Sequence, residues 1–138
     1  MRYLLDTNAC VDYLSGRHPS VTVRLQQSAP EEVCISCIVA AELRYGADKS
    51  RWPPLNHQRL DTLLGEVRLL DFDASAARAY GSLRTALERH GQPIGANDML
   101  IAAQALSAKL IVVTDNVREF SRVRGLKVEN WRRSPPRS

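Results

Sequence analysis

The chain has 138 residues, of which 44% are hydrophobic and 6% aromatic, and its formal net charge is +4. This length and composition fit one compact domain with an aliphatic core and exclude a largely disordered chain. No stretch approaches the length of a membrane-spanning helix, and three cysteines, an odd number, give no disulfide framework. The apolar start is interrupted at Asp6, so no secretory signal is expected and the cytoplasm is the expected compartment.

Short apolar runs alternate with helical stretches along the chain. In order, the predicted elements are a strand at Tyr3 to Asp6, helices at about Ala9 to Leu14 and Val21 to Gln27, a strand at Glu32 to Ile35, helices at Ile38 to Tyr45 and around Leu60 to Leu64, a strand at Val67 to Phe72, helices at Ala74 to Arg89 and Asp98 to about Ala108, a strand at Leu110 to Thr114, a short helix around Val117 to Arg122 and a strand near Lys127 to Glu129. This alternation predicts an α/β domain, a three-layer sandwich with a central parallel sheet flanked by helices.

Several boundaries have recognisable signals. Ser36 and Asn97 are predicted to cap the helices that follow them. Gly46 is expected to end the helix begun at Ser36, and Pro53-Pro54 to form a loop. The domain is predicted to span residues 1–131, with a basic, Pro-rich tail at 132–138.

Acidic residues follow two of the predicted strands. Asp6 ends the first strand, and Asp115 and Glu119 come after the continuous apolar strand that ends at Thr114. In a parallel α/β sheet, ligands bind beyond the carboxyl ends of the strands, where the strand order reverses. If these two strands are neighbours at that point, their acids converge.

Two further acids lie on helices. Asp98 begins an apolar helix, and Glu42 lies in the apolar run Val39 to Leu43, where a carboxylate is costly unless it is paired or bound to metal. A divalent cation such as Mg²⁺ prefers such oxygen ligands, and it can activate water and polarise a phosphoryl oxygen. Asp6 and Asp98 are assigned as direct ligands, with Glu42 and Glu119 as further ligands or as residues that orient the attacking water.

Each acid also has an ordinary structural interpretation. Asp6 can simply cap a helix, Asp98 and Glu119 can favour a helix dipole, and Glu42 can face solvent. Cys34 and Cys37 form a C-x-x-C motif, but two ordinary thiols are expected because Cys34 belongs to the strand. The two tryptophans, at positions 52 and 131, are expected to pack at the rim of the domain rather than stack on bases.

Four segments resemble the conserved motifs of one family, the PIN-domain ribonucleases, and more narrowly the VapC-type toxins of toxin–antitoxin pairs. The segments are Tyr3-Leu4-Leu5-Asp6-Thr7-Asn8, Ile38 to Gly46 around Glu42, Ile94 to Ala103 around Asp98, and Thr114-Asp115-Asn116-Val117-Arg118-Glu119-Phe120. The resemblance covers Tyr3 to Trp131. Four motifs in the right order and at matching spacing are specific to this family.

The resemblance implies a PIN fold, endonucleolytic cleavage of RNA, tRNA in several relatives, and dependence on Mg²⁺ or Mn²⁺. It also implies a homodimer and inhibition by a VapB-type antitoxin. The catalytic residues would be Asp6, Glu42, Asp98 and Glu119, and the metal ligands Asp6, Asp98 and Glu119. A second group of candidates comprises Asn8, Thr114, Asp115 and Asn116. The residues alone leave open whether Asp115 or Glu119 is the fourth acid, and the motif spacing favours Glu119.

Two alternatives belong to other classes. A phosphatase of the haloacid dehalogenase type also uses an acid after the first strand, but it has a second Asp two residues later, where this chain has Asn8. A non-catalytic RNA-binding module would gain nothing from four carboxylates when it binds a polyanion.

Overall fold

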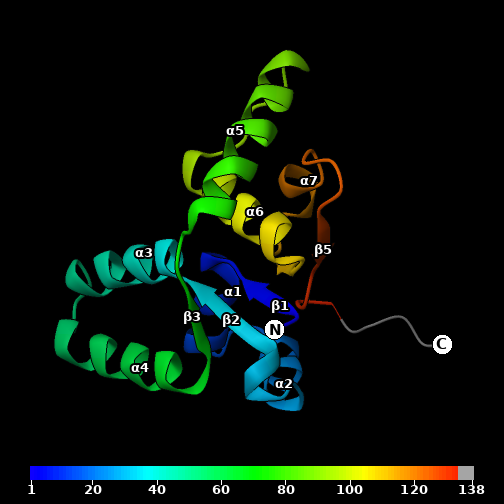
Figure 1. The fold of residues 1–138 in the computed structure, drawn as a ribbon. Coiled ribbons are helices and arrows are strands. Elements are labelled where there is room, and N and C mark those ends of the chain that lie inside the picture. Colours follow the sequence, from blue (N-terminus) through cyan, green and yellow to red (C-terminus); the bar gives the residue numbers. More distant parts are fainter. Residues whose placement is uncertain (134–138) are drawn as a thin grey trace.

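A computed structural model describes residues 1–133, and the predicted tail residues 134–138 lie outside the described part. Its centre is a five-stranded parallel sheet in the order β3-β2-β1-β4-β5 (Figure 1). The strands are β1 (Tyr3–Leu5), β2 (Val33–Ser36), β3 (Arg68–Leu70), β4 (Ile111–Val113) and β5 (Lys127–Glu129). The order reverses at β1, because the chain runs outward from β1 to β3 and then returns to place β4 on the other side of β1.

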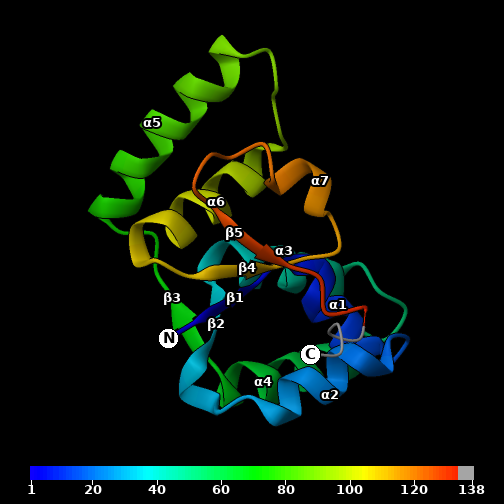
Figure 2. The same cartoon turned by 90° about the vertical axis from the view of Figure 1, so that its right-hand side faces the viewer.

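Helices connect successive strands and cover both faces of the sheet. They are α1 (Thr7–Ser15), α2 (Pro19–Gln27), α3 (Cys37–Asp48), α4 (Pro53–Glu66), α5 (Ala74–Arg89), α6 (Ala96–Ala108) and α7 (Val117–Phe120). Helices α5, α6 and α7 lie on one side, and α1, α2 and α4 on the other (Figure 2). This arrangement confirms the predicted three-layer sandwich with a central parallel sheet.

The central strands are buried on both faces. All residues of β1 and β2 are buried, as are Val112 and Val113 of β4, whereas the edge strands β3 and β5 are partly exposed. Burial on both faces explains why the central strands are continuous apolar runs rather than alternating ones. The apolar helix α6 is also central, with Ile101 to Ala105 all buried.

Three predicted boundaries are wrong. Helix α3 continues through Gly46 to Asp48, since glycine weakens a helix without forbidding it. Helix α4 begins at Pro53, where the missing N–H of proline would have no helical partner in any case. Gly95, rather than Asn97, occupies the N-cap of α6. The predicted Ser36 cap of α3 is confirmed, and its side chain accepts a hydrogen bond from the Ile38 amide.

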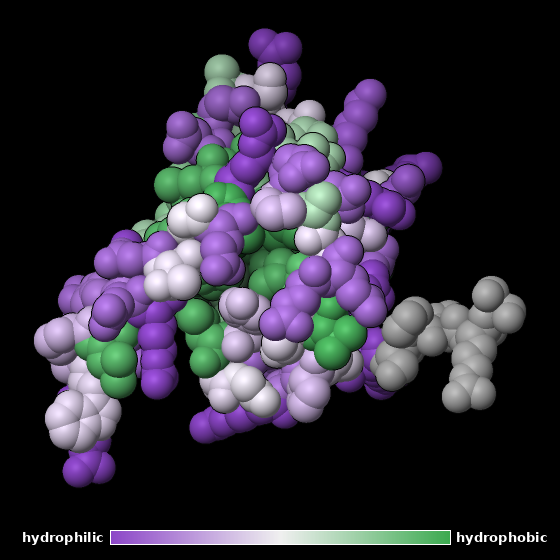
Figure 3. All heavy atoms as spheres, turned by 90° about the horizontal axis from the view of Figure 1, so that it is seen from below, coloured by the Kyte–Doolittle hydropathy of each residue, from purple (hydrophilic) through white to green (hydrophobic). Residues whose placement is uncertain are grey.

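The two tryptophans behave differently. Trp131 packs against the domain, as predicted, but it lies in the core rather than at the rim, with 1% exposed and its ring edge-on to Tyr3. Trp52 is 62% exposed at the α3–α4 connection, so the prediction that it packs at the rim is wrong. Helices α3 and α4 project from the sheet as a hairpin, and the far end of that hairpin carries mainly hydrophilic side chains in the view from below (Figures 1 and 3).

Candidate active site

The strands that precede the acids are neighbours in the sheet. Leu5 of β1 lies opposite Val113 of β4, and the Asp6 amide donates a hydrogen bond of 3.0 Å to the Val113 carbonyl. The residues after these strands, Asp6 on one side and Thr114 and Asp115 on the other, therefore share one edge of the sheet. The predicted convergence at the reversal of strand order is confirmed.

Asp6 is a helix cap inside a buried site. Its Oδ1 atom accepts a 2.8 Å hydrogen bond from the Ala9 amide, and only 4% of the residue is exposed. Burial, and to a smaller extent the charges of Asp115 and Asp98, raise the pKa of Asp6 to about 7. Hydrogen bonds from Thr114 and the Ala9 amide oppose that shift. The capping interpretation is thus correct, and it is compatible with a functional one.

Asp98 and Glu119 form a hydrogen-bonded pair of carboxyl groups. Burial, and then the charge of Glu119, raise the pKa of Asp98 to about 6. The pKa of Glu119 is lowered, first by the Gly95 amide, which donates to Oε1 at 2.6 Å, and also by the Asn116 side chain, which donates to Oε2 at 2.6 Å. The opposite directions of the two pKa shifts mean that Asp98 binds a proton more readily than Glu119 does.

Glu42 joins the same group from α3. It is half-buried, and its Oε1 atom accepts a 3.0 Å hydrogen bond from the Thr7 hydroxyl. Its charge is one of the causes that raise the pKa of Asp98. The structure therefore brings all four predicted acids to one site, where the charge of Asp98 raises the pKa of Asp6 and the charges of both glutamates raise the pKa of Asp98.

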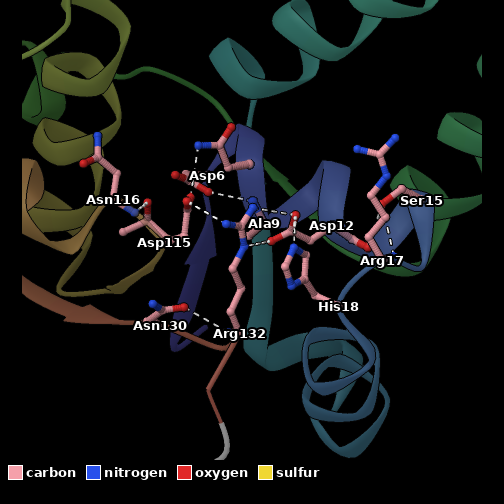
Figure 4. A network of polar contacts seen from close by, with 12 residues as sticks. Asp6, Ala9, Asp12, Ser15, Arg17, His18, Asp115, Asn116, Asn130 and Arg132 are labelled. Carbon is pink, nitrogen blue, oxygen red and sulfur yellow. Dashed lines mark hydrogen bonds and ion pairs between the residues drawn. The ribbon is translucent and has the colours of Figure 1, made fainter.

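Asp115 lies at the edge of this group and has partners of its own. Its Oδ1 atom accepts a 3.0 Å hydrogen bond from Asn8, and its Oδ2 atom is 3.0 Å from Arg132 (Figure 4). In residues 1–133, no ion pair reaches Asp6, Glu42, Asp98 or Glu119. Within the described residues none of the four acids forms an ion pair, although the charge of Arg122 helps to lower the pKa of Glu119, whereas Asp115 is paired with Arg132.

A divalent ion fits the chemistry of these four carboxylates. They supply the hard oxygen atoms that Mg²⁺ and Mn²⁺ prefer, and the pKa values of Asp6 and Asp98 are raised first by burial and then by neighbouring carboxylates, a cost of negative charge that a cation would relieve. The described part of the chain contains no group of three His, Cys, Asp or Glu side chains already arranged to hold a metal ion. The metal assignment rests on the donor chemistry.

Two contributors were not singled out from the sequence. Thr7 orients Glu42 through its hydroxyl. Gly95 allows close approach, because a Cβ there would lie 3.3 Å from Oδ2 of Asp98 and 3.6 Å from Oε1 of Glu119. A glycine directly before a helix with an acid in its first turn is the signal that could have identified Gly95.

An apolar groove opens beside the acids. It has a volume of about 440 Å³, lies between α1, α3 and α4, and has Thr7 and Glu42 among its lining residues. Val11, Leu43 and Leu60 give it a hydrophobic wall, and Arg59 a charged one.

None of the described helices is long and apolar enough to cross a membrane.

Known proteins resemble this chain in both fold and sequence. The PIN domain family matches residues 3–126. The tRNA(fMet)-specific endonuclease VapC of Shigella flexneri is 40% identical over 131 residues, which cover 95% of this chain and 98% of that protein. Ribonuclease VapC2 of Rickettsia felis is 44% identical over 133 residues, with the same coverage. The crystal structure of VapBC2 from Rickettsia felis, bound to a promoter DNA fragment, matches with a TM-score of 0.89 and 41% identity over 95% of this chain and 99% of that one.

The chain therefore belongs to the PIN domain family and, within it, to the VapC-type ribonucleases, the toxins of toxin–antitoxin pairs. The family membership predicted from the four motifs is confirmed. The phosphatase and binding-module alternatives find no support in these matches, because the relatives are ribonucleases.

Proposed function

We propose that this endoribonuclease depends on Mg²⁺, or Mn²⁺ in its place, bound by Asp6, Asp98 and Glu119, with Glu42 orienting the attacking water. The observation that carries the proposal is the gathering of four carboxylates that form no ion pair within residues 1–133. Clustered carboxylates repel one another, so a site built from them favours a bound cation.

The surrounding residues would hold these carboxylates in place. Thr7 fixes Glu42, while the Gly95 amide and Asn116 fix the two oxygens of Glu119. The Ala9 amide fixes Asp6. A bound Mg²⁺ would lower the pKa of a water molecule and polarise a phosphoryl oxygen, the two effects that hydrolysis of a phosphodiester requires.

We propose RNA as the substrate, with tRNA as the first class to test because the Shigella flexneri relative is named for tRNA(fMet). Exposed aromatic and basic residues at the end of the α3–α4 hairpin suit an RNA strand. Tyr45 is 65% and Trp52 62% exposed, with Lys49 over the first ring and Arg51 over the second. Such rings stack on unpaired bases while the cations contact phosphates. The cytoplasm, where such RNA occurs, is the proposed place of action.

The proposed protein partner is a VapB-type antitoxin, because the structures that this chain resembles are VapBC complexes. An antitoxin segment in the apolar groove beside Glu42 could place a basic side chain among the unpaired carboxylates, where a charge-assisted pair is strong. We also propose a homodimer, which the resemblance implies.

The decisive test compares Asp98→Asn with Asp71→Asn. Both changes remove one negative charge, but Asp71 is an exposed acid in the loop after β3. Asn is nearly isosteric with Asp, so the fold, followed by circular dichroism, should survive in both variants. We expect Asp98→Asn to abolish Mg²⁺-dependent cleavage of tRNA and Asp71→Asn to leave it unchanged. Cleavage by Asp98→Asn at the wild-type rate, or full cleavage in EDTA, would remove the metal site from the mechanism.

Inhibition needs a separate experiment. Expression of the chain alone should arrest growth, and co-expression with the protein encoded by a neighbouring short reading frame should restore it. If the purified complex of the two cleaves RNA as fast as the free chain does, the inhibition model is wrong.

A further inference from the structure

A guanidinium group lies beside the acid cluster without joining it. Arg132, at the C-terminal end of the described chain, contacts Asp12 through Nε at 2.6 Å and Nη2 at 2.9 Å, and Asp115 through Nη1 at 3.0 Å (Figure 4). These partners belong to different elements, because Asp12 lies on α1 and Asp115 follows β4. Arg132 thus links three segments far apart in the sequence.

The contact with Asp12 fixes the guanidinium in place. Asp12 is buried, with 5% of the residue exposed, and it meets Arg132 in a two-pronged pair, the geometry that holds both planar groups most firmly. His18 also approaches Asp12, at 3.7 Å. Because Asp12 and the Asp6 cap both belong to α1, the position of Arg132 is set relative to the active site by one helix.

Asp115 is held by this fixed cation and by an amide. Arg132 forms an ion pair with its Oδ2 atom, and the Asn8 side chain donates a hydrogen bond to its Oδ1 atom. Both oxygens therefore have protein partners, and the negative charge has a counter-ion. The neighbouring acid Asp6 has hydrogen bonds but no ion pair among residues 1–133. Two carboxylates that follow adjacent strands therefore differ both in burial and in pairing, because Asp115 is partly exposed and forms an ion pair, whereas Asp6 is buried and forms none among residues 1–133.

We infer that Arg132 is a positioning residue that withholds Asp115 from the metal site, so that the ion is bound by the unpaired acids alone. This inference rests on the metal dependence proposed above. Arg132 itself touches neither ion nor RNA in this scheme, and it acts through the carboxylate that it holds. Without Arg132, Asp115 loses its counter-ion and keeps only the hydrogen bond from Asn8, so its Oδ2 atom becomes available beside Asp6, and an added carboxylate strengthens the binding of a hard divalent cation.

The test measures Mn²⁺ binding by calorimetry in the absence of RNA. We expect Arg132→Gln to bind Mn²⁺ roughly tenfold more tightly than the wild type, because the site gains one carboxylate. Asp115→Asn should bind about as the wild type does, and in the double variant the gain from Arg132→Gln should disappear. The matched control is Arg133→Gln, which removes the same charge from the next, exposed residue and should leave the affinity unchanged.

Three results would overturn the inference. They are unchanged or weaker binding by Arg132→Gln, an equal gain in the Asp115→Asn background, and an equal gain from Arg133→Gln. The last two would show an effect of charge that does not pass through Asp115. If Arg132→Gln fails to fold, Arg132→Lys decides, because lysine keeps the charge but lacks the fork that spans both acids. Tighter binding by Arg132→Lys supports the inference, and unchanged or weaker binding contradicts it. Absence of Mn²⁺ binding by the wild type would instead refute the proposed function.

Discussion

Asp6→Asn should make the metal-free protein more stable at pH 8. Asparagine is as good an N-cap as aspartate, so the bond from the Ala9 amide can persist while the charge is lost. The folded-state pKa of Asp6 is raised from 3.8 to about 7, so the buried carboxyl favours its protonated form. The stability that this preference gives is fully present below pH 3.8, and it is lost as the pH rises through about 7.

The size of the effect follows from the same shift. Ionising Asp6 costs the folded state about 4 kcal/mol at pH 8 relative to the unfolded chain. The amide of the new asparagine must find a partner in a buried place, which costs about 1–2 kcal/mol. We therefore expect a net gain of about 2 kcal/mol, or a rise in Tm of roughly 6 °C.

Thermal and urea unfolding in EDTA at pH 8 and pH 5 would measure this gain, which should be smaller at pH 5. Asp73→Asn is the matched control, because Asp73 also caps a helix, α5, through its side chain but is exposed. It should change stability by less than about 0.5 kcal/mol. Added Mn²⁺ should stabilise the wild type and have a much smaller effect on Asp6→Asn. If Asp6→Asn is less stable than the wild type at pH 8 in EDTA, the argument from burial of an unpaired charge is refuted.

Three further changes test the geometry of the site. Glu119→Gln should weaken Mn²⁺ binding and slow cleavage at least tenfold more than Asp115→Asn does, and the reverse ranking in calorimetry and rate assays would reassign the fourth acid. Gly95→Ala would bring a Cβ to 3.3 Å from a carboxylate oxygen of the site, so cleavage should fall about tenfold, while Gly81→Ala in the open middle of α5 should leave the rate unchanged. Trp52→Ala should raise the KM for RNA about tenfold at unchanged kcat and unchanged Tm, as expected for loss of one stacked base, and an unaltered KM would exclude the hairpin from RNA binding.

The asparagine variant at Asp6 should also be inactive, because Asp6 is a proposed metal ligand. Higher stability with lost activity is the expected signature of a residue kept for chemistry rather than for folding. The same logic separates Asp6 from Asp73, two caps with the same local geometry in different surroundings.

Local sequence patterns were sufficient for the framework of this protein. Continuous apolar runs predicted the buried strands, and the helix predicted at Ala74 to Arg89 has these ends in the structure, where the Asp73 side chain caps its start and His90 its end. The alternation of strands and helices predicted a parallel sheet. Because ligands bind beyond the carboxyl ends of such strands, at the reversal of strand order, the sequence also predicted that Asp6 lies near the end of the strand at Thr114. The periodicity of a segment and its end signals are local properties, so they can be recognised without knowing what the segment contacts.

The tertiary structure decided which charges are paired. Asp12 and Arg132 are separated by 120 positions, and no local pattern indicates that they meet. That contact holds Arg132 where it pairs with Asp115, whereas Asp6, one strand away, forms no ion pair within residues 1–133. The close approach at Gly95 likewise exists only because α6 and α7 bring Asp98 and Glu119 together. The free energy of a buried carboxylate depends on solvent exclusion and on charges a few ångströms away, and only the folded chain determines both.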